Sequence, residues 1–203
     1  MFLMSLEINR LGWQPDKVLE NQWESDDEFD SEYDLKVEEV EDVKEIFPAI
    51  CEKLEKSNLV KFRVEGFGDL PWPVDVSIDL MTVLEQLADL LRFIEDYKST
   101  SFSWDFYEQG TERRLIFSHV GNLVNINCLP LVMKSTKIAN NSKDSWGQYR
   151  EEEPLTRHNL KSMIGNLITT FVSIAHEIGP TLTSHKCFQE WYNDKYIANC
   201  WRR

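Results

Sequence analysis

The sequence has little glycine and none of the motifs that identify common enzyme classes. Only 8 glycines occur in 203 residues, which leaves few places where the backbone could wrap closely around a phosphate group. There is no glycine-rich phosphate loop, no H-E-x-x-H pair, no G-x-S-x-G turn and no zinc-ligand spacing. We therefore predict no cofactor and no catalytic residue, and an enzyme of this sequence would need a site assembled from distant residues.

Positive charge is also scarce. The chain has 22 Lys and Arg against 35 Asp and Glu, a formal net charge of −13 and a pI near 4.8. Nucleic acids and anionic membranes both require a basic surface, so neither is expected as a partner. No apolar run approaches the roughly eighteen residues that span a bilayer, and the N-terminus lacks the basic start of a signal peptide. These absences predict a cytoplasmic protein.

Cysteine and histidine give only weak signals. The cysteines Cys51, Cys128, Cys187 and Cys200 lack C-x-x-C spacing, which is typical of free thiols in a cytosolic protein, although a Cys187–Cys200 disulfide is an alternative. His185 and Cys187 could supply two metal ligands, but H-x-C also occurs as an ordinary surface pair. Glu108 is an alternative catalytic carboxylate, and Glu112 is better explained by ion pairs with neighbouring arginines.

Most of the negative charge lies in one stretch. Between Glu20 and Glu45 the chain has thirteen acidic residues and two lysines, so this stretch carries −11 of the total of −13. Its densest part, Trp23 to Asp34, also contains three aromatic residues. A chain whose charge is concentrated in this way has a strongly electronegative face. We therefore expect a basic protein as its partner.

This acidic arm, at about 20–34, has two other interpretations. It could be a solvated linker, or its rings could cover the sheet and leave only the carboxylates outside. Aromatic rings are costly to leave in water, however, and the arm connects a predicted strand to a predicted helix. We therefore predict that its carboxylates steer association and that its rings form the buried contacts. The predicted partner-binding residues are Trp23, Glu24, Asp26, Asp27, Glu28, Phe29, Asp30, Glu32, Tyr33 and Asp34. No metal is predicted there, because the EF-hand pattern is absent.

The hydrophobic periodicity predicts an α+β fold. Alternation predicts strands at about 1–13, 59–65, 102–106, 114–118 and 123–128, with a further extended segment at Val74 and Val76. Helical spacing begins near Leu35 and should be interrupted or kinked at Pro48. Two long amphipathic helices are predicted at about 80–97, with Asp79 as N-cap, and from Pro154 or Thr156 to 178, and a short helix near 188–192. We expect a single domain over 1–203, an antiparallel sheet with these two long helices packed on one face, and a polar loop at about 134–153.

The chain resembles the small acidic immunity proteins encoded beside bacterial polymorphic toxins. The resemblance lies in its acidic balance, its α+β pattern and the missing catalytic motifs. Three segments, at 64–67, 72–76 and 105–113, are also similar to segments of a bacterial family, but they carry no functional residue over. The resemblance implies a non-catalytic inhibitor that covers the basic active-site or substrate cleft of a toxin domain. The alternatives are an enzyme with an unrecognised site and an adaptor whose arm only confers solubility. The sequence leaves the oligomeric state open.

Overall fold

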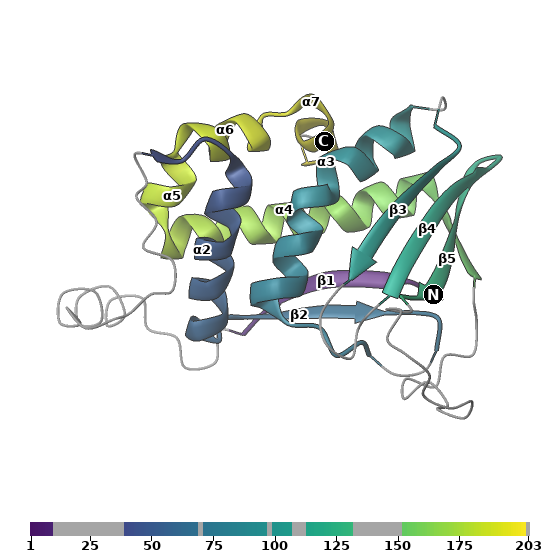
Figure 1. Cartoon of the computed structure of the whole chain (residues 1–203), viewed down its shortest axis with the longest axis horizontal. Helices are drawn as coiled ribbons and strands as arrows, with labels where there is room; N and C mark the ends of the chain where they lie inside the picture. The colour runs from purple at the N-terminus through teal and green to yellow at the C-terminus, as the bar shows by residue number, and fades with distance from the viewer. Residues whose placement is uncertain (10–38, 69–70, 97–98, 107–112, 132–151, 202–203) are drawn as a thin grey trace, which may run out of the picture.

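The computed structural model describes residues 1–9, 39–68, 71–96, 99–106, 113–131 and 152–201. It is a mixed α/β structure whose strands are all antiparallel (Figure 1). This confirms the α+β prediction at the level of fold class. The arrangement of sheets and helices differs from the one predicted in several places.

The first two strands form a sheet of their own. Strands β1 (Leu3–Ile8) and β2 (Val60–Glu65) pair antiparallel, with Leu6 opposite Phe62. Their alternation is the one the sequence predicts, because Met4, Leu6 and Phe62 are buried on one face. Alternation shows that a segment is a strand but not which strand it joins. The prediction of one common sheet is therefore wrong.

The second sheet has four strands in the order β3–β4–β5–β6. Strands β3 (Ser101–Phe106), β4 (Arg113–Val120) and β5 (Leu123–Pro130) confirm the three predicted neighbours. Strand β4 runs two residues further than predicted, since the turn needs only Gly121 and Asn122. Gly121 has φ of +59°, which suits a two-residue hairpin turn. Strand β6 (Glu152–Thr156) was missed because it is polar and contains Pro154.

Helix α2 (Val43–Ser57) continues through Pro48. The predicted interruption there is wrong, because the apolar residues on both sides of this proline, Ile46, Phe47 and Ile50, are fully buried and hold the helix in place. The helix begins after Asp42, and residues 10–38 lie outside the description.

An extended segment was predicted at Val74 and Val76. The backbone is extended at Asp75, but Val76 already belongs to a helical turn. Residues Val76–Leu80 form a π-helical turn, η2, that leads directly into helix α3 (Met81–Glu95). Asp75, not Asp79, caps this turn by accepting from the backbone N–H groups of Ile78 and Asp79. The Asp79 carboxylate is buried and accepts from the Asp75 N–H at 3.0 Å. The predicted apolar stripe of α3 is confirmed as buried.

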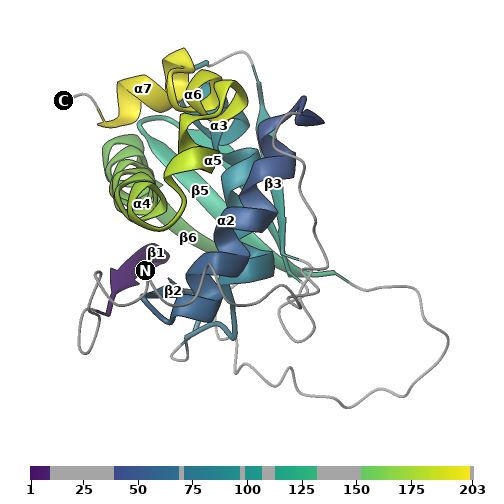
Figure 2. The same ribbon diagram turned by 90° about the vertical axis from the view of Figure 1, so that its left-hand side faces the viewer.

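Helix α4 (Arg157–Ile178) begins beside the second of its two predicted starting points, Pro154 and Thr156. Thr156 is its N-cap, and the Thr156 hydroxyl accepts from the Asn159 N–H. Three short helices follow: α5 (Pro180–Ser184), α6 (Lys186–Tyr192) and α7 (Lys195–Trp201). The described ranges therefore contain six α-helices, where a helix from about Leu35, two long helices and one short helix had been expected. Figures 1 and 2 show them gathered on one side of the four-stranded sheet.

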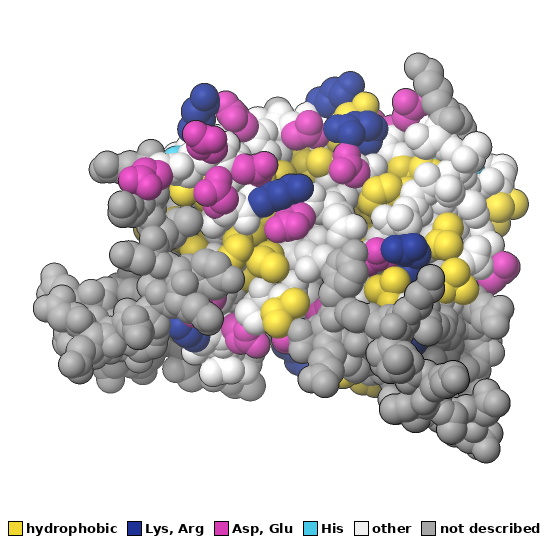
Figure 3. Space-filling view, in the orientation of Figure 1, with side chains coloured by type: hydrophobic (Ala, Val, Ile, Leu, Met, Phe, Trp, Pro, Cys, Tyr) yellow, Lys and Arg dark blue, Asp and Glu magenta, His cyan; other side chains and the backbone are white. Residues whose placement is uncertain are grey.

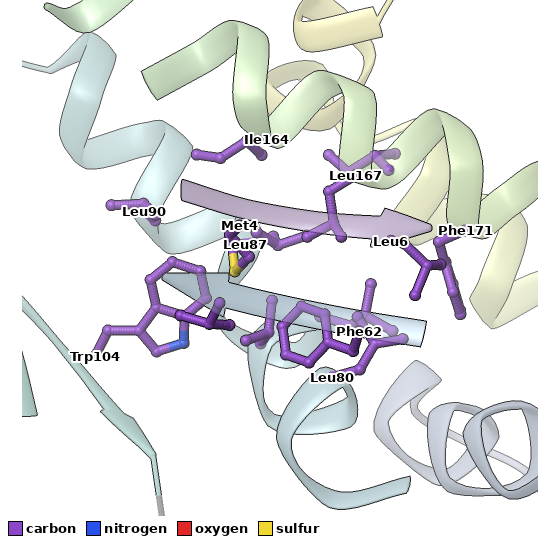
Figure 4. Packing of buried hydrophobic residues seen from close by; sticks show 14 of the residues in the cluster. Met4, Leu6, Phe62, Leu80, Leu87, Leu90, Trp104, Ile164, Leu167 and Phe171 are labelled. Carbon is purple, nitrogen blue, oxygen red and sulfur yellow. The ribbon is translucent and has the colours of Figure 1, made fainter. Parts of the chain in front are cut away.

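The core joins both sheets to the helices. Figure 4 shows Met4 and Leu6 of β1 meeting Leu87 of α3, Leu167 of α4 and Trp104 of β3 in one buried cluster. Helix α7 packs closely against α4 at Gly165, where a Cβ atom would lie 2.7 Å from the Cys200 carbonyl oxygen. The two sheets are thus bound to the same set of helices.

Candidate functional site

The acidic arm lies outside the described residues, together with all ten predicted partner-binding residues. Glu108 and Glu112 also lie outside them, as do residues 134–151 of the polar loop predicted at 134–153. The last two residues of that prediction, Glu152 and Glu153, belong to strand β6, so the loop ends earlier than predicted. The described residues on either side of the arm do show where it is attached. Asn9 donates from its N–H to the Leu59 carbonyl at 2.7 Å, beside the C-terminal end of α2. Val40 is buried beside the N-terminal end of α2, where its carbonyl accepts from the Cys187 thiol at 3.8 Å.

The N-terminal end of α2 holds two exposed carboxylates, those of Asp42 and Glu45, in a fixed arrangement. Asp42 Oδ1 accepts from the Lys44 N–H at 2.9 Å. Glu45 Oε1 accepts from the N–H groups of Glu41 and Asp42 at 3.1 and 2.9 Å. This capping box uses carboxylates where the helix dipole stabilises negative charge. The acidic end of the arm is therefore continuous with an ordered, negatively charged helix terminus.

Helix α3 brings further carboxylates next to this terminus. Burial raises the pKa of Glu85, the charge of Lys44 lowers it, and the charge of Asp42 raises it. Glu85 therefore lies close enough to the first turn of α2 to interact electrostatically with Asp42 and Lys44. Asp89 lies one turn further along α3 and pairs with Arg92 at 2.7 Å. The carboxylates of Asp42 and Glu85, on two different helices, thus lie close enough to repel each other.

We refer to these groups together as the acidic surface. Figure 3 shows Asp and Glu side chains gathered at the upper left, over the region of α2, α3 and α6 in Figure 1. We define the acidic surface by the charged residues of the first turn of α2 and the residues before it, of α3, and of α6, since α2 contacts both other helices. These residues are Glu39, Glu41, Asp42, Glu45, Glu85, Asp89 and Glu190, accompanied by Lys44, Arg92 and Lys186. Seven carboxylates against three cations leave an excess of four negative charges. Sequence periodicity shows the charges on α2 but not their approach to Glu85.

A second polar feature, which sequence reasoning missed, is the buried carboxylate of Glu153 on β6. Its side chain is 6% exposed, and Oε1 accepts from the Phe67 N–H at 2.9 Å and pairs with the Met1 amine at 3.2 Å. Oε2 has no hydrogen-bond partner within the described structure. The group ties the four-stranded sheet to the loop that follows β2.

That loop has a strained backbone. Gly66 has φ of +133° and Phe67 has φ of +63°, a region that bulky residues rarely adopt. The Phe67 ring packs against Phe2 and Trp72, with ring centroids 5.9 and 6.1 Å apart. Because Phe67 is buried and its N–H is bound by Glu153, the surrounding structure holds it in this conformation. We call Gly66, Phe67 and Glu153 the carboxylate clamp and assign it a structural role.

The weaker candidates have structural explanations. His185 caps α6, and its Nδ1 accepts from the Cys187 N–H at 3.3 Å. Within the described ranges, no three His, Cys, Asp or Glu side chains could hold a metal ion together. All four cysteines are free, so the Cys187–Cys200 disulfide is not formed. His176, at the end of α4, shares a hydrogen bond of 2.8 Å with the Thr183 hydroxyl.

Comparisons with known proteins do not assign the chain to a family. No protein-family model, curated protein or solved structure matches the chain. The described helices include none that is long and apolar enough to cross a membrane. The resemblance to immunity proteins therefore stays a prediction.

Proposed function

We propose that the protein is a non-catalytic inhibitor that binds a basic partner protein, in the manner of a bacterial immunity protein that covers a toxin's active-site or substrate cleft. The observation that carries this proposal is the acidic surface beside the attachment point of the acidic arm. Ordered carboxylates of α2 and α3 extend the charge of the arm onto a rigid part of the fold. A large, partly rigid electronegative region is suited to a basic cleft.

Such a surface would inhibit by competing for cations. Enzymes that act on nucleic acids or nucleotides bind phosphate groups with Lys and Arg side chains. Carboxylates placed over the same side chains would exclude the substrate without any chemical step. Long-range attraction would accelerate association by about 10-fold to 1,000-fold at low salt, whereas the aromatic rings of the arm would slow dissociation.

The test begins with affinity capture from native lysate, followed by association-rate measurements on the purified partner at 50 and 500 mM salt. One variant neutralises four carboxylates of the acidic surface and leaves the cap intact: Glu39→Gln, Glu41→Gln, Glu85→Gln and Asp89→Asn. A second variant neutralises four in the arm: Asp26→Asn, Asp27→Asn, Glu28→Gln and Asp30→Asn. A matched control removes the same charge from exposed positions elsewhere: Glu7→Gln, Glu55→Gln, Glu152→Gln and Glu177→Gln.

We expect both test variants to associate about tenfold more slowly at low salt, with a weaker salt dependence, and the control to change less than about twofold. Equal rates for the test variants and the control would remove the acidic surface from the interface. An unchanged affinity after loss of the arm charges alone would favour the adaptor alternative. Recovery of no partner would favour an enzyme, and metabolite screening would follow.

A further inference from the structure

Strand β1 has a strand partner on one side only. Its sheet contains β1 and β2 and no third strand within the described ranges. Met4 of β1 lies opposite Val64, whose carbonyl accepts from the Trp72 N–H at 2.8 Å on the edge of β2 that faces away from β1. Two opposed residues of an antiparallel pair either bond to each other or both point outward. The Met4 N–H therefore points to the outer edge of β1.

A methionine sulfur takes the place of a strand at this point. The Met4 N–H donates to Sδ of Met163, on helix α4, at 3.1 Å. Helix α4 packs along β1, and Figure 4 shows Ile164 and Leu167 of this helix above the strand. A thioether sulfur is a weak acceptor with two lone pairs. The Met4 N–H occupies one of them and leaves the other.

Met163 differs in this respect from the other described methionines. Met4 is fully buried, Met1 is 78% exposed and Met81 is half-buried. Met163 is also half-buried, and of these four it is the one whose sulfur accepts a hydrogen bond within the described ranges. It thus combines partial exposure with a sulfur that is held on one side.

We infer that Met163 is a site of reversible oxidation by peroxides, and that the Met4 N–H directs the incoming oxygen to one side of the sulfur. The unoccupied lone pair attacks the peroxide, so that an S–O bond forms as the O–O bond breaks. The proton of the transferred oxygen moves to the leaving oxygen, which departs as water or an alcohol. The sulfur loses two electrons and the peroxide gains them. Because the bound lone pair is shielded, one of the two sulfoxide epimers should predominate.

Oxidation at this position weakens the contact between α4 and β1. The sulfoxide is polar and chiral, and it replaces an apolar side chain that packs against the core. The oxidised sulfur also has less electron density on its remaining lone pair, so it is a poorer acceptor for the Met4 N–H. Sulfoxide reductases, one for each epimer, restore the thioether. The modification is therefore a reversible way to loosen β1.

The test treats the full chain with hydrogen peroxide, in the native state and in urea. All proteins carry Cys187→Ser, because Cys187 is a half-buried free thiol that peroxide would also oxidise. The protein is then digested, the peptides are treated with one or the other epimer-specific reductase, and mass spectrometry measures how much sulfoxide each reductase removes. At Met163 we expect about a fivefold excess of one epimer in the native protein and nearly equal epimers in urea.

Met81 is the matched control, since it is half-buried too and should give nearly equal epimers in the native protein. Three results would overturn the inference: Met163 that stays unoxidised in the native protein, equal epimers at Met163, or the same excess at Met81. The last would show that the hydrogen bond is not the cause of the selectivity.

A second variant tests the effect on β1. Met163→Leu removes the sulfur and keeps an apolar side chain of similar size. Peroxide should lower the urea midpoint of the Cys187→Ser protein, both reductases together should restore it, and the protein that also carries Met163→Leu should not change. The same loss in both proteins would place the effect at another methionine and overturn the role of Met163 in holding β1.

Discussion

A single added methyl group at Gly66 should strongly destabilise the protein. The φ of Gly66 is +133°, and a Cβ atom there would lie 2.8 Å from the Phe2 Cα and 3.3 Å from Glu153 Oε2. The first contact is with backbone at the start of β1, which is paired with β2 and cannot move alone. Gly66→Ala therefore combines backbone strain with a clash against a fixed neighbour.

The magnitude follows from three contributions. Holding a residue other than glycine in this region of φ costs about 1–3 kcal/mol. Inserting a methyl group into a packed site costs about 1–3 kcal/mol more. Reduced freedom of the unfolded chain returns about 0.4–1 kcal/mol. Together they lower the free energy of unfolding by about 1–5 kcal/mol, with a central value of about 3 kcal/mol.

Gly121→Ala is the matched control. Its φ of +59° imposes left-handed strain of about 1–2 kcal/mol, but no atom lies within 4 Å of the added Cβ. The reduced freedom of the unfolded chain offsets part of this strain, so Gly121→Ala should lower the free energy of unfolding by about 1 kcal/mol. The comparison therefore isolates the clash at the carboxylate clamp from the strain that both glycines share.

Urea denaturation followed by tryptophan fluorescence measures both variants, since Trp72 and Trp104 are buried. Thermal unfolding should show the same order, with a fall in Tm of about 5–15 °C for Gly66→Ala and about 4 °C or less for Gly121→Ala. Equal losses would refute the reasoning, because they would show that Phe2 and the loop after β2 can separate at no cost.

Three further predictions concern titratable groups. Glu153→Ala should lower the free energy of unfolding by about 1–3 kcal/mol, in addition to the cost of the lost packing, because the Phe67 N–H loses its acceptor. Glu153→Gln keeps an acceptor and should lower the free energy of unfolding by less. Urea denaturation measures both variants, and equal losses would contradict the prediction. The raised pKa of Glu85 means that the folded state binds more protons just above pH 4.5, so stability falls as pH rises there. In urea denaturation, Glu85→Gln should thus be more stable than the wild type at pH 7 and as stable as the wild type below pH 4.5. A stability difference between the two proteins that is the same at both pH values would contradict this prediction. Burial raises the pKa of the Cys51 thiol, and the charge of Glu55 raises it further. A thiol reagent should therefore label half-buried Cys187 in the native protein and label Cys51 only after unfolding. Labelling of the native Cys187→Ser variant would contradict this prediction.

The sequence predicts a helix or strand well when the spacing of its own apolar residues determines which side chains are buried. The stripe of α3 is buried as expected because seven apolar residues recur at helical spacing. Strands β3, β4 and β5 were predictable because short connections join them in order. The start of α4 was predicted at Pro154 or Thr156 from the helical spacing of the apolar residues that follow, and the structure places the N-cap at Thr156.

The elements that could not be predicted depend on contacts between distant residues. Glu153 lies in a polar strand, and only tertiary structure brings it to Phe67, 86 residues away in sequence. Asp75 and Asp79 are equally good caps by residue type, and the choice depends on the π-helical turn between them. The division into two sheets likewise depends on how β1 and β2 pack beneath α4. The acidic arm was recognised by composition, and its role as an interface stays a prediction.

The proposed interface should respond to salt in one direction. Binding of a basic partner by the acidic surface depends on attraction between unlike charges, so screening should weaken it. Contacts made by aromatic rings depend little on screening, so the dissociation rate should change with salt less than the association rate. An association rate that is the same at 50 and 500 mM salt would contradict the role proposed for the carboxylates.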